Sequence, residues 1–126
     1  MNGSDILLDS NIIIYLSKRK VNISDIFFDN TNYYISIITY MELLSYNFTN
    51  KKEEDLISQI LSSLKILNID LAIANRVISL KKSRKIKLPD AIIVATAMYY
   101  NLTLFTNDKQ LLNIKDIKTK EIKVLT

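Results

Sequence analysis

The chain has 126 residues, which suits one domain with a continuous hydrophobic core that needs neither disulfides nor a structural metal. It contains no cysteine and no histidine, which excludes thiolate catalysis, disulfide bonds, the usual zinc sites and a histidine general base. Lys and Arg number 17 against 13 Asp and Glu, and the resulting net charge of +4 fits a polyanionic partner, although lysine-rich faces also simply keep proteins soluble.

The N-terminal segment does not have the pattern of an export signal or a membrane anchor. Residues 1–5 carry no basic side chain, and the apolar run of residues 6–16 is interrupted by Asp9, Ser10 and Asn11. Together with the absence of cysteine, this pattern favours a cytoplasmic protein that is not associated with a membrane.

The first predicted elements are a strand and a helix joined by a polar turn. Residues 6–8 are a short apolar run that predicts a buried strand, and residues 12–16 predict the opening of a helix. Asp9 lies directly after this strand.

Residues 33–38 are rich in β-branched and aromatic side chains and predict a second strand. Residues 39–46 predict the helix that follows, with Thr39 as its N-cap. Glu42 is then expected in the first turn of that helix.

The middle of the chain continues the alternation of helix and strand. Apolar side chains in residues 53–64 recur at helical spacing with charged and serine residues between them, which predicts an amphipathic helix. Residues 64–69 predict a third strand, and Asp70 is the expected cap of a helix that runs through residues 72–80.

The one proline, Pro89, suits the first turn of a helix, and the apolar residues 90–100 that follow it predict a helix packed on a sheet. Residues 102–105 predict a strand that ends shortly before Asp108. Residues 122–125 are the candidate for a final edge strand, and no linker or repeat divides the chain, so we expect a single domain over residues 1–126.

Strands separated by helices favour an α/β fold with a mostly parallel sheet covered on both faces. Ligands of such sheets gather at the carboxyl ends of the strands. Asp9 and Asp108 directly follow predicted strands, and Glu42 and Asp90 begin predicted helices that can start at the same edge. Because ionised carboxylates are costly to bury unless they are paired or metal-bound, a bound cation is the simplest common explanation for all four.

Each acid also has an ordinary structural explanation. Asp9 can cap a helix, Glu42 and Asp90 can be first-turn charges that favour the helix dipole, and Asp108 can be a turn residue. Only their occurrence together favours a metal site.

The segments that contain the four acids resemble the PIN-domain ribonucleases and, within them, the VapC toxins of toxin–antitoxin pairs. In chain order the matching segments are Leu7-Leu8-Asp9-Ser10-Asn11, Ser36-Ile37-Ile38-Thr39-Tyr40-Met41-Glu42-Leu43, Leu88-Pro89-Asp90-Ala91 and Phe105-Thr106-Asn107-Asp108. The resemblance implies a three-layer α/β/α sandwich, hydrolysis of RNA phosphodiesters with Mg²⁺ or Mn²⁺, a small antitoxin partner and a homodimer.

The same resemblance implies roles for individual residues. Asp9 is expected as a direct metal ligand with Asp90 beside it, and Glu42 and Asp108 as ligands directly or through waters. The match is loosest at Asp108, because many relatives carry a further acid where this chain has Gln110 and Leu111. An all-oxygen set without histidine independently suits Mg²⁺ or Mn²⁺ far better than zinc.

Supporting roles fall to Asn11 and Thr106, which can orient carboxylates or touch phosphate, or can satisfy local backbone instead. Arg84, Lys85 and Lys87 precede the helix that contains Asp90 and are candidates to bind the RNA backbone.

Three other functions are compatible with much of the same sequence pattern. A PIN-fold nuclease of RNA processing that is not a toxin needs the same four acids. A non-catalytic module that binds RNA or protein would not need the complete set. A phosphatase with an aspartate nucleophile normally has a second aspartate two residues after the first, and this chain has Asn11 there.

Overall fold

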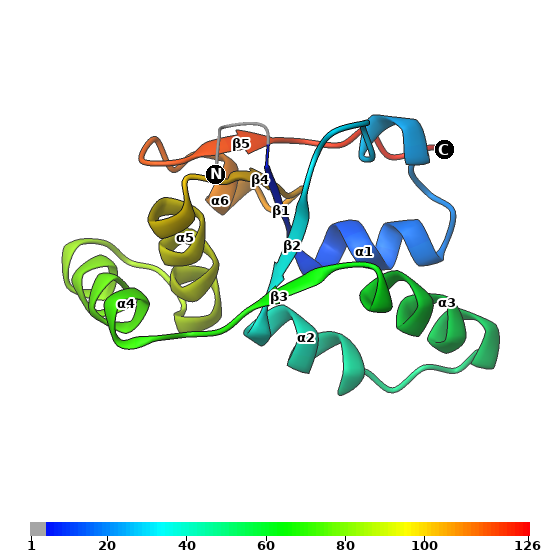
Figure 1. Ribbon diagram of the computed structural model, residues 1–126, viewed down its shortest axis with the longest axis horizontal. Coiled ribbons are helices and arrows are strands. Elements are labelled where there is room, and N and C mark those ends of the chain that lie inside the picture. Colours follow the sequence, from blue (N-terminus) through cyan, green and yellow to red (C-terminus); the bar gives the residue numbers. More distant parts are fainter. Residues whose placement is uncertain (1–4) are drawn as a thin grey trace.

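The computed structural model describes residues 5–126, so the first four residues of the expected domain lie outside it. Within residues 5–126 five short strands form one sheet in the order β3-β2-β1-β4-β5, and every neighbouring pair is parallel (Figure 1). The strands are β1 (Ile6–Leu8), β2 (Tyr33–Ser36), β3 (Lys65–Leu67), β4 (Thr103–Phe105) and β5 (Lys118–Lys120). The predicted α/β class with a parallel sheet is therefore confirmed.

Helices cover both faces of the sheet, as three-layer packing requires. They are α1 (Ser10–Ser17), the 3₁₀ turn η1 (Ile23–Asp25), α2 (Ile37–Leu44), α3 (Lys51–Ser62), α4 (Leu71–Ser83), α5 (Leu88–Tyr100) and α6 (Lys109–Leu112). None of these helices is both long and apolar enough to cross a lipid bilayer.

Alternation of side chains along the strands divides the core into two halves. Leu7 and Leu104 point to the half built with α4, α5 and α6, whereas Leu8 and Phe105 point to the half built with α1, α2 and α3. α5 is buried along most of its length, from Ala91 to Ala97, as the small and apolar side chains of this segment predict.

The strand order places the carboxyl end of β1 at a topological switch point. The chain leaves β1 toward β2 and β3 on one side and later returns to add β4 and β5 on the other. At such a point the connections that follow neighbouring strands depart in different directions, and ligands of α/β sheets bind there. Asp9 and Thr106 are the first residues after the two strands.

The second helix begins earlier than predicted. Its N-cap is Ser36, whose hydroxyl accepts a hydrogen bond from the Ile38 amide at 3.2 Å. The prediction of Thr39 as the cap is therefore wrong, because the β-branched pair Ile37 and Ile38 forms the first helical turn and not the end of the strand. Glu42 consequently lies in the second turn and not in the first.

The predicted final strand is also displaced. The edge strand is Lys118–Lys120, and residues 122–125 are not a strand. Lysine-rich segments suit an exposed sheet edge because their charges discourage pairing with another chain. Ile122 instead contributes its side chain to the core on the α1 side of the sheet.

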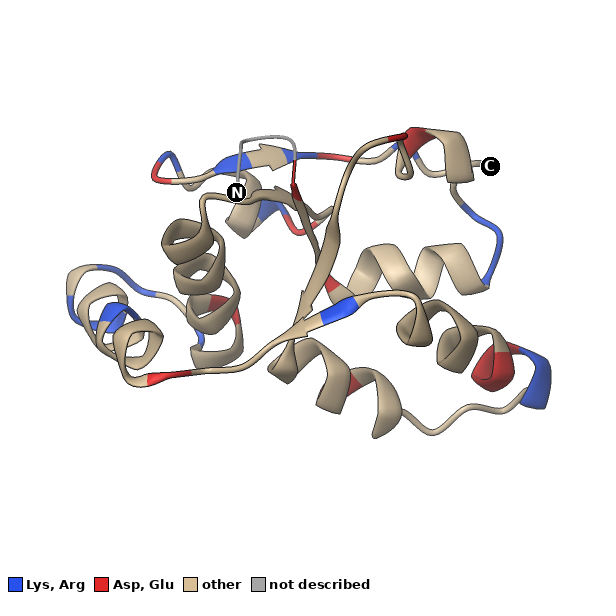
Figure 2. Cartoon of the chain, in the orientation of Figure 1, with Lys and Arg blue, Asp and Glu red and all other residues tan. Residues whose placement is uncertain are grey.

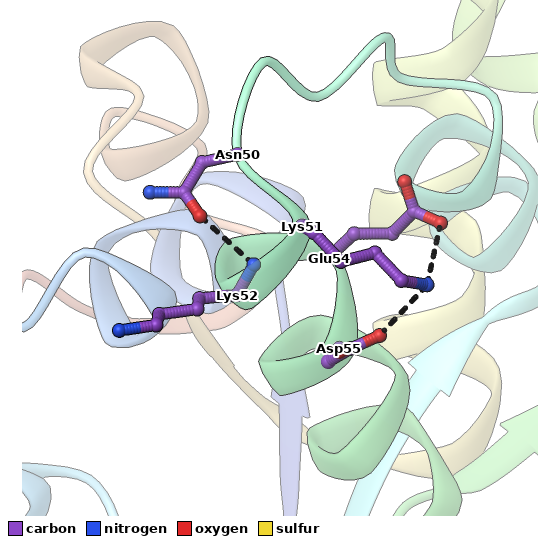
Figure 3. Close-up of polar contacts among 5 residues, drawn as sticks. All are labelled: Asn50, Lys51, Lys52, Glu54 and Asp55. Carbon is purple, nitrogen blue, oxygen red and sulfur yellow. Dashed lines mark hydrogen bonds and ion pairs between the residues drawn. The ribbon is translucent and has the colours of Figure 1, made fainter.

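Away from the sheet, α3 is fixed by local contacts at its first turn. Asn50 accepts a hydrogen bond from the Lys52 amide at 2.8 Å, and Lys51 pairs with Asp55 at 3.1 Å (Figure 3). The Asn50 cap stabilises the start of the helix, whereas the solvent-exposed ion pair contributes little to stability.

Candidate metal and nucleic-acid site

Asp9 is both a helix cap and a buried acid. It is 8% exposed and begins α1, where its Oδ1 atom accepts a hydrogen bond from the Ser10 amide at 2.8 Å. Its Oδ2 atom accepts a hydrogen bond from the Thr106 hydroxyl at 2.6 Å and a longer one from the Asn11 side-chain amide at 3.4 Å. The capping explanation is therefore correct, but it accounts for only one of the two carboxylate oxygens.

Thr106 joins the ends of β1 and β4. Its hydroxyl donates to Asp9 and accepts a hydrogen bond from the Asp108 amide at 3.1 Å. Asn11 makes a second link, because its side-chain oxygen accepts a hydrogen bond from the Asn107 amide at 3.3 Å. Thr106 and Asn11 thus hold the polar turns that follow these two strands against each other.

Asn107 has a structural role that sequence reasoning missed. Its side chain donates to the Ile122 carbonyl at 2.9 Å and accepts from the Ile122 amide at 2.8 Å. This paired contact anchors the segment after β5 beside the site. The available signal was its position inside the polar turn that follows a strand, where asparagine often bonds to backbone.

Asp108 caps α6 through a hydrogen bond that its Oδ1 atom accepts from the Gln110 amide at 2.9 Å. Asp90 lies half-buried in the first turn of α5, and Glu42 is exposed on α2. The four acids therefore lie at four separate helices. Their positions in the sequence alone do not show that these helices meet.

Electrostatic coupling shows that these acids share one region of the protein. Burial raises the pKa of Asp9 most; hydrogen bonds from Thr106 and Ser10 oppose this, and the charge of Asp108 adds to it. Burial also raises the pKa of Asp90, followed by the charges of Asp108 and Asp9. Mutual repulsion of this kind is relieved by a bound cation.

Glu42 belongs to the same group. Its pKa is raised first by desolvation and then by the charges of Asp9 and Asp90. Lys87, three residues before Asp90, acts in the opposite direction and lowers the pKa of Asp90.

The donor set fits a hydrated hard cation. In residues 5–126 no three acidic side chains lie close enough together to enclose a metal ion directly. Mg²⁺ commonly keeps several waters and takes only one or two protein carboxylates, so a looser ring of oxygen donors is compatible with it. Ligation by all four acids remains a prediction.

Two buried threonines offer a matched test of the Thr106 contact. Thr106 and Thr39 are both 0% exposed, but the Thr39 hydroxyl has no hydrogen-bond partner among the described residues. Thr106→Val is expected to lower the free energy of unfolding by about 1.5–3 kcal/mol, because a hydrogen bond to a charged group is lost. Thr39→Val is expected to be neutral or stabilising, since it removes an unpaired hydroxyl. Urea unfolding of both variants measures the difference, and equal losses would contradict the proposed importance of the Thr106–Asp9 bond.

Comparison with known proteins agrees with this architecture. The family model of the PIN domain matches residues 6–117. The chain is similar to a toxin–antitoxin complex from Klebsiella pneumoniae, with 34% identity, a TM-score of 0.68, and coverage of 89% of this chain and 94% of the other. No curated protein sequence matches it.

Two further solved structures share the fold at lower identity. VapBC2 from Rickettsia felis bound to a DNA fragment from its promoter has 20% identity and a TM-score of 0.77, covering 94% of this chain and 99% of that one. DNA-bound VapBC from Salmonella typhimurium has 23% identity and a TM-score of 0.78, covering 93% and 97%. The match over nearly the whole described chain shows that this protein belongs to the PIN-domain family, with the fold found in VapBC toxin–antitoxin complexes.

Proposed function

We propose that this PIN domain is a divalent-metal-dependent endoribonuclease and the toxin of a toxin–antitoxin pair. The observation that supports this most directly is the electrostatic coupling of Asp9, Glu42 and Asp90, with Asp108, at the switch point of a parallel sheet. PIN domains generally use divalent metal ions, and the oxygen-only donor set suits Mg²⁺ or Mn²⁺.

The proposed reaction is in-line attack of water on the phosphorus of an RNA phosphodiester. When bound, the metal ion supplies an activated water near neutral pH and neutralises charge that develops on the phosphate. Asp9 and Asp90 would hold the ion, and Glu42 and Asp108 would do so directly or through waters. Thr106 and the Ser10 amide fix both oxygens of Asp9, so little reorganisation is needed for binding.

The basic residues provide a route for the polyanion. Figure 2 shows basic segments on α4 and in the connection that leads to α5. Lys87 lies at the N-cap of α5 and influences Asp90, and Arg84 and Lys85 precede it in the connection. We propose that these cations guide RNA toward the acidic group.

The partners proposed for the chain are a small antitoxin and a second copy of itself. The structural neighbours are toxin–antitoxin complexes, which supports the first. α4 exposes Leu71 and Ile78, which are 77% and 52% exposed and offer apolar surface for an interface. The proposed function includes a cytoplasmic location.

The proposed activity is tested by incubating the purified protein with a mixed RNA pool. Cleavage is expected with Mg²⁺ or Mn²⁺ and is expected to stop when EDTA is added, because no histidine is available as an alternative base. Gel analysis and sequencing of the fragments give rate and cut sites. A protein that binds RNA but does not cut it in the presence of either metal is a non-catalytic module.

Toxin status requires a separate experiment. Induced expression in a bacterial host is expected to arrest growth, and co-expression of a small partner gene, if one is found immediately upstream, is expected to restore it. An RNA-processing nuclease would cleave RNA in the first assay but would show no antidote in the second.

A further inference from the structure

A small pocket adjoins the acidic group, between the α4–α5 connection and α6. Its volume is about 270 Å³, and Asp90 is one of its lining residues. The apolar part of its wall consists of Ile86, Leu111 and Ile114. Arg84, Lys85 and Gln110 supply the polar part.

Hydrogen bonds and an ion pair hold this wall in place. The Lys81 ammonium donates to the Ile86 carbonyl at 2.7 Å, which ties the connection to α4. The Asp108 cap holds the backbone of Gln110 at the start of α6, and Leu111 beside it is buried. One guanidinium nitrogen of Arg84 contacts Asp116 at 3.3 Å. An arginine has five N–H donors, so this contact leaves others for a ligand.

The chemistry of the wall matches that of one nucleotide. Apolar side chains accept the face of a base, and a glutamine amide places a donor and an acceptor side by side, as base-edge recognition requires. Arg84 and Lys85 provide the positive charge that a phosphate needs. The volume is slightly below the range of drug-sized ligand pockets, which suits one unit of a polymer and not a large cofactor.

We propose that this pocket binds the base of a nucleotide next to the scissile phosphate, with Gln110 reading the base edge and Arg84 holding the flanking phosphate. The proposal rests on the proposed function, because the pocket is linked to the acidic group through Asp90, which belongs to both. Two cations, Arg84 and Lys85, line the pocket beside one acid, Asp90, which favours RNA over an acidic or apolar protein segment. Gln110 is thereby a specificity-determining residue and Arg84 a substrate-binding residue.

The test compares the cut sites of wild type, Gln110→Ala and Gln110→Glu on a randomised RNA pool. Wild type is expected to prefer one base at one position beside the cut. Gln110→Ala is expected to reduce that preference roughly tenfold, since a side chain paired with a base edge contributes on that order. Gln110→Glu keeps only acceptors and is expected to change which base is preferred. Gln59→Ala is the matched control, because Gln59 is an exposed residue of α3, which packs on the opposite face of the sheet. This variant is expected to keep the wild-type pattern of cut sites.

Arg84 is tested through the salt dependence of RNA binding. Arg84→Ala is expected to reduce the slope of log affinity against log salt by about 0.7, the value for one phosphate contact with a single strand. Lys52→Ala removes one exposed cation from α3 and is expected to leave the slope unchanged.

Failure of the proposal differs from failure of the proposed function. If wild type cuts no RNA, the nuclease function is wrong. If wild type cuts RNA and the Gln110 variants keep the same sites in the same proportions, the nuclease stands and the base pocket is wrong. Unchanged cut sites with weaker antitoxin binding would assign the pocket to the protein partner and likewise overturn the proposal.

Discussion

Asp9→Asn is expected to abolish metal-dependent RNA cleavage while the protein stays folded. The substitution removes the charge of the acid that is most tightly held in the site, and with it a direct ligand of the proposed cation. Metal ions contribute several kcal/mol to stabilisation of the transition state, so the rate is expected to fall at least about a hundredfold.

Stability is expected to change little in this variant. Asparagine is as good an N-cap as aspartate and keeps an oxygen for the Ser10 amide or for Thr106. The loss of the charged hydrogen bond from Thr106 is offset because the substitution also removes a buried charge that is repelled by Asp108. Circular dichroism and urea unfolding measure the fold, and single-turnover cleavage measures the loss of activity.

Asp70→Asn is the matched control for this substitution. Asp70 is likewise an N-cap aspartate, and its Oδ1 atom accepts a hydrogen bond from the Ile73 amide at 2.9 Å at the start of α4. It is not among the charges that shift the pKa values of Asp9, Glu42 or Asp90. Asp70→Asn is expected to keep full activity, and active Asp9→Asn protein would show that Asp9 is only a cap.

The second large expected effect is a change in the stability of the folded protein with pH, which bound metal reverses. The pKa values of Asp9, Glu42 and Asp90 are all raised, from ordinary values of 3.8 for aspartate and 4.5 for glutamate. The folded protein therefore binds protons more strongly than the unfolded chain at these positions. Their contribution to stability is complete below the ordinary values and is lost as the pH rises through the raised values of the folded protein.

Without metal, the three acids are thus expected to make wild type progressively less stable relative to Asp90→Asn as the pH rises above the ordinary carboxylate pKa values and through the raised values of the folded protein. Mg²⁺ binds the ionised carboxylates and is expected to reverse this difference at the upper end of the range, by raising the melting temperature of wild type more than that of the variant. Thermal unfolding across pH, with Mg²⁺ and with EDTA, measures both effects. Identical pH profiles of wild type and variant without metal would show that burial and the neighbouring acids do not raise the pKa of Asp90.

Much of the fold could be predicted from local sequence because its signals are local. Short apolar runs mark β1 and β4, helical spacing marks α3, and Asp70 and Pro89 mark helix starts. Asp9 could be placed at a strand end because it directly follows such a run, and Asp108 because it closely follows one. Elements whose signals were ambiguous were misplaced, since Ile37 and Ile38 favour a strand by composition yet begin α2.

The edge strand shows why composition is insufficient at a sheet border. Residues 122–125 look more strand-like than Lys118–Lys120, but pairing with β4 depends on backbone hydrogen bonds, which lysine and threonine make as well as valine does. Ile122 is buried, and its amide and carbonyl bond to the Asn107 side chain instead of to a neighbouring strand.

Composition and local patterns are sufficient to predict the residue types of the site, an all-oxygen set without histidine or cysteine, and the alternation of elements that produces a parallel α/β sheet. Which side chains meet depends on the tertiary fold. The Thr106–Asp9 bond joins residues 97 positions apart, and the pocket of Asp90 and Gln110 joins α5 to α6. Such contacts depend on strand order and crossover direction, which are set by packing of the whole chain and leave no local pattern in the sequence.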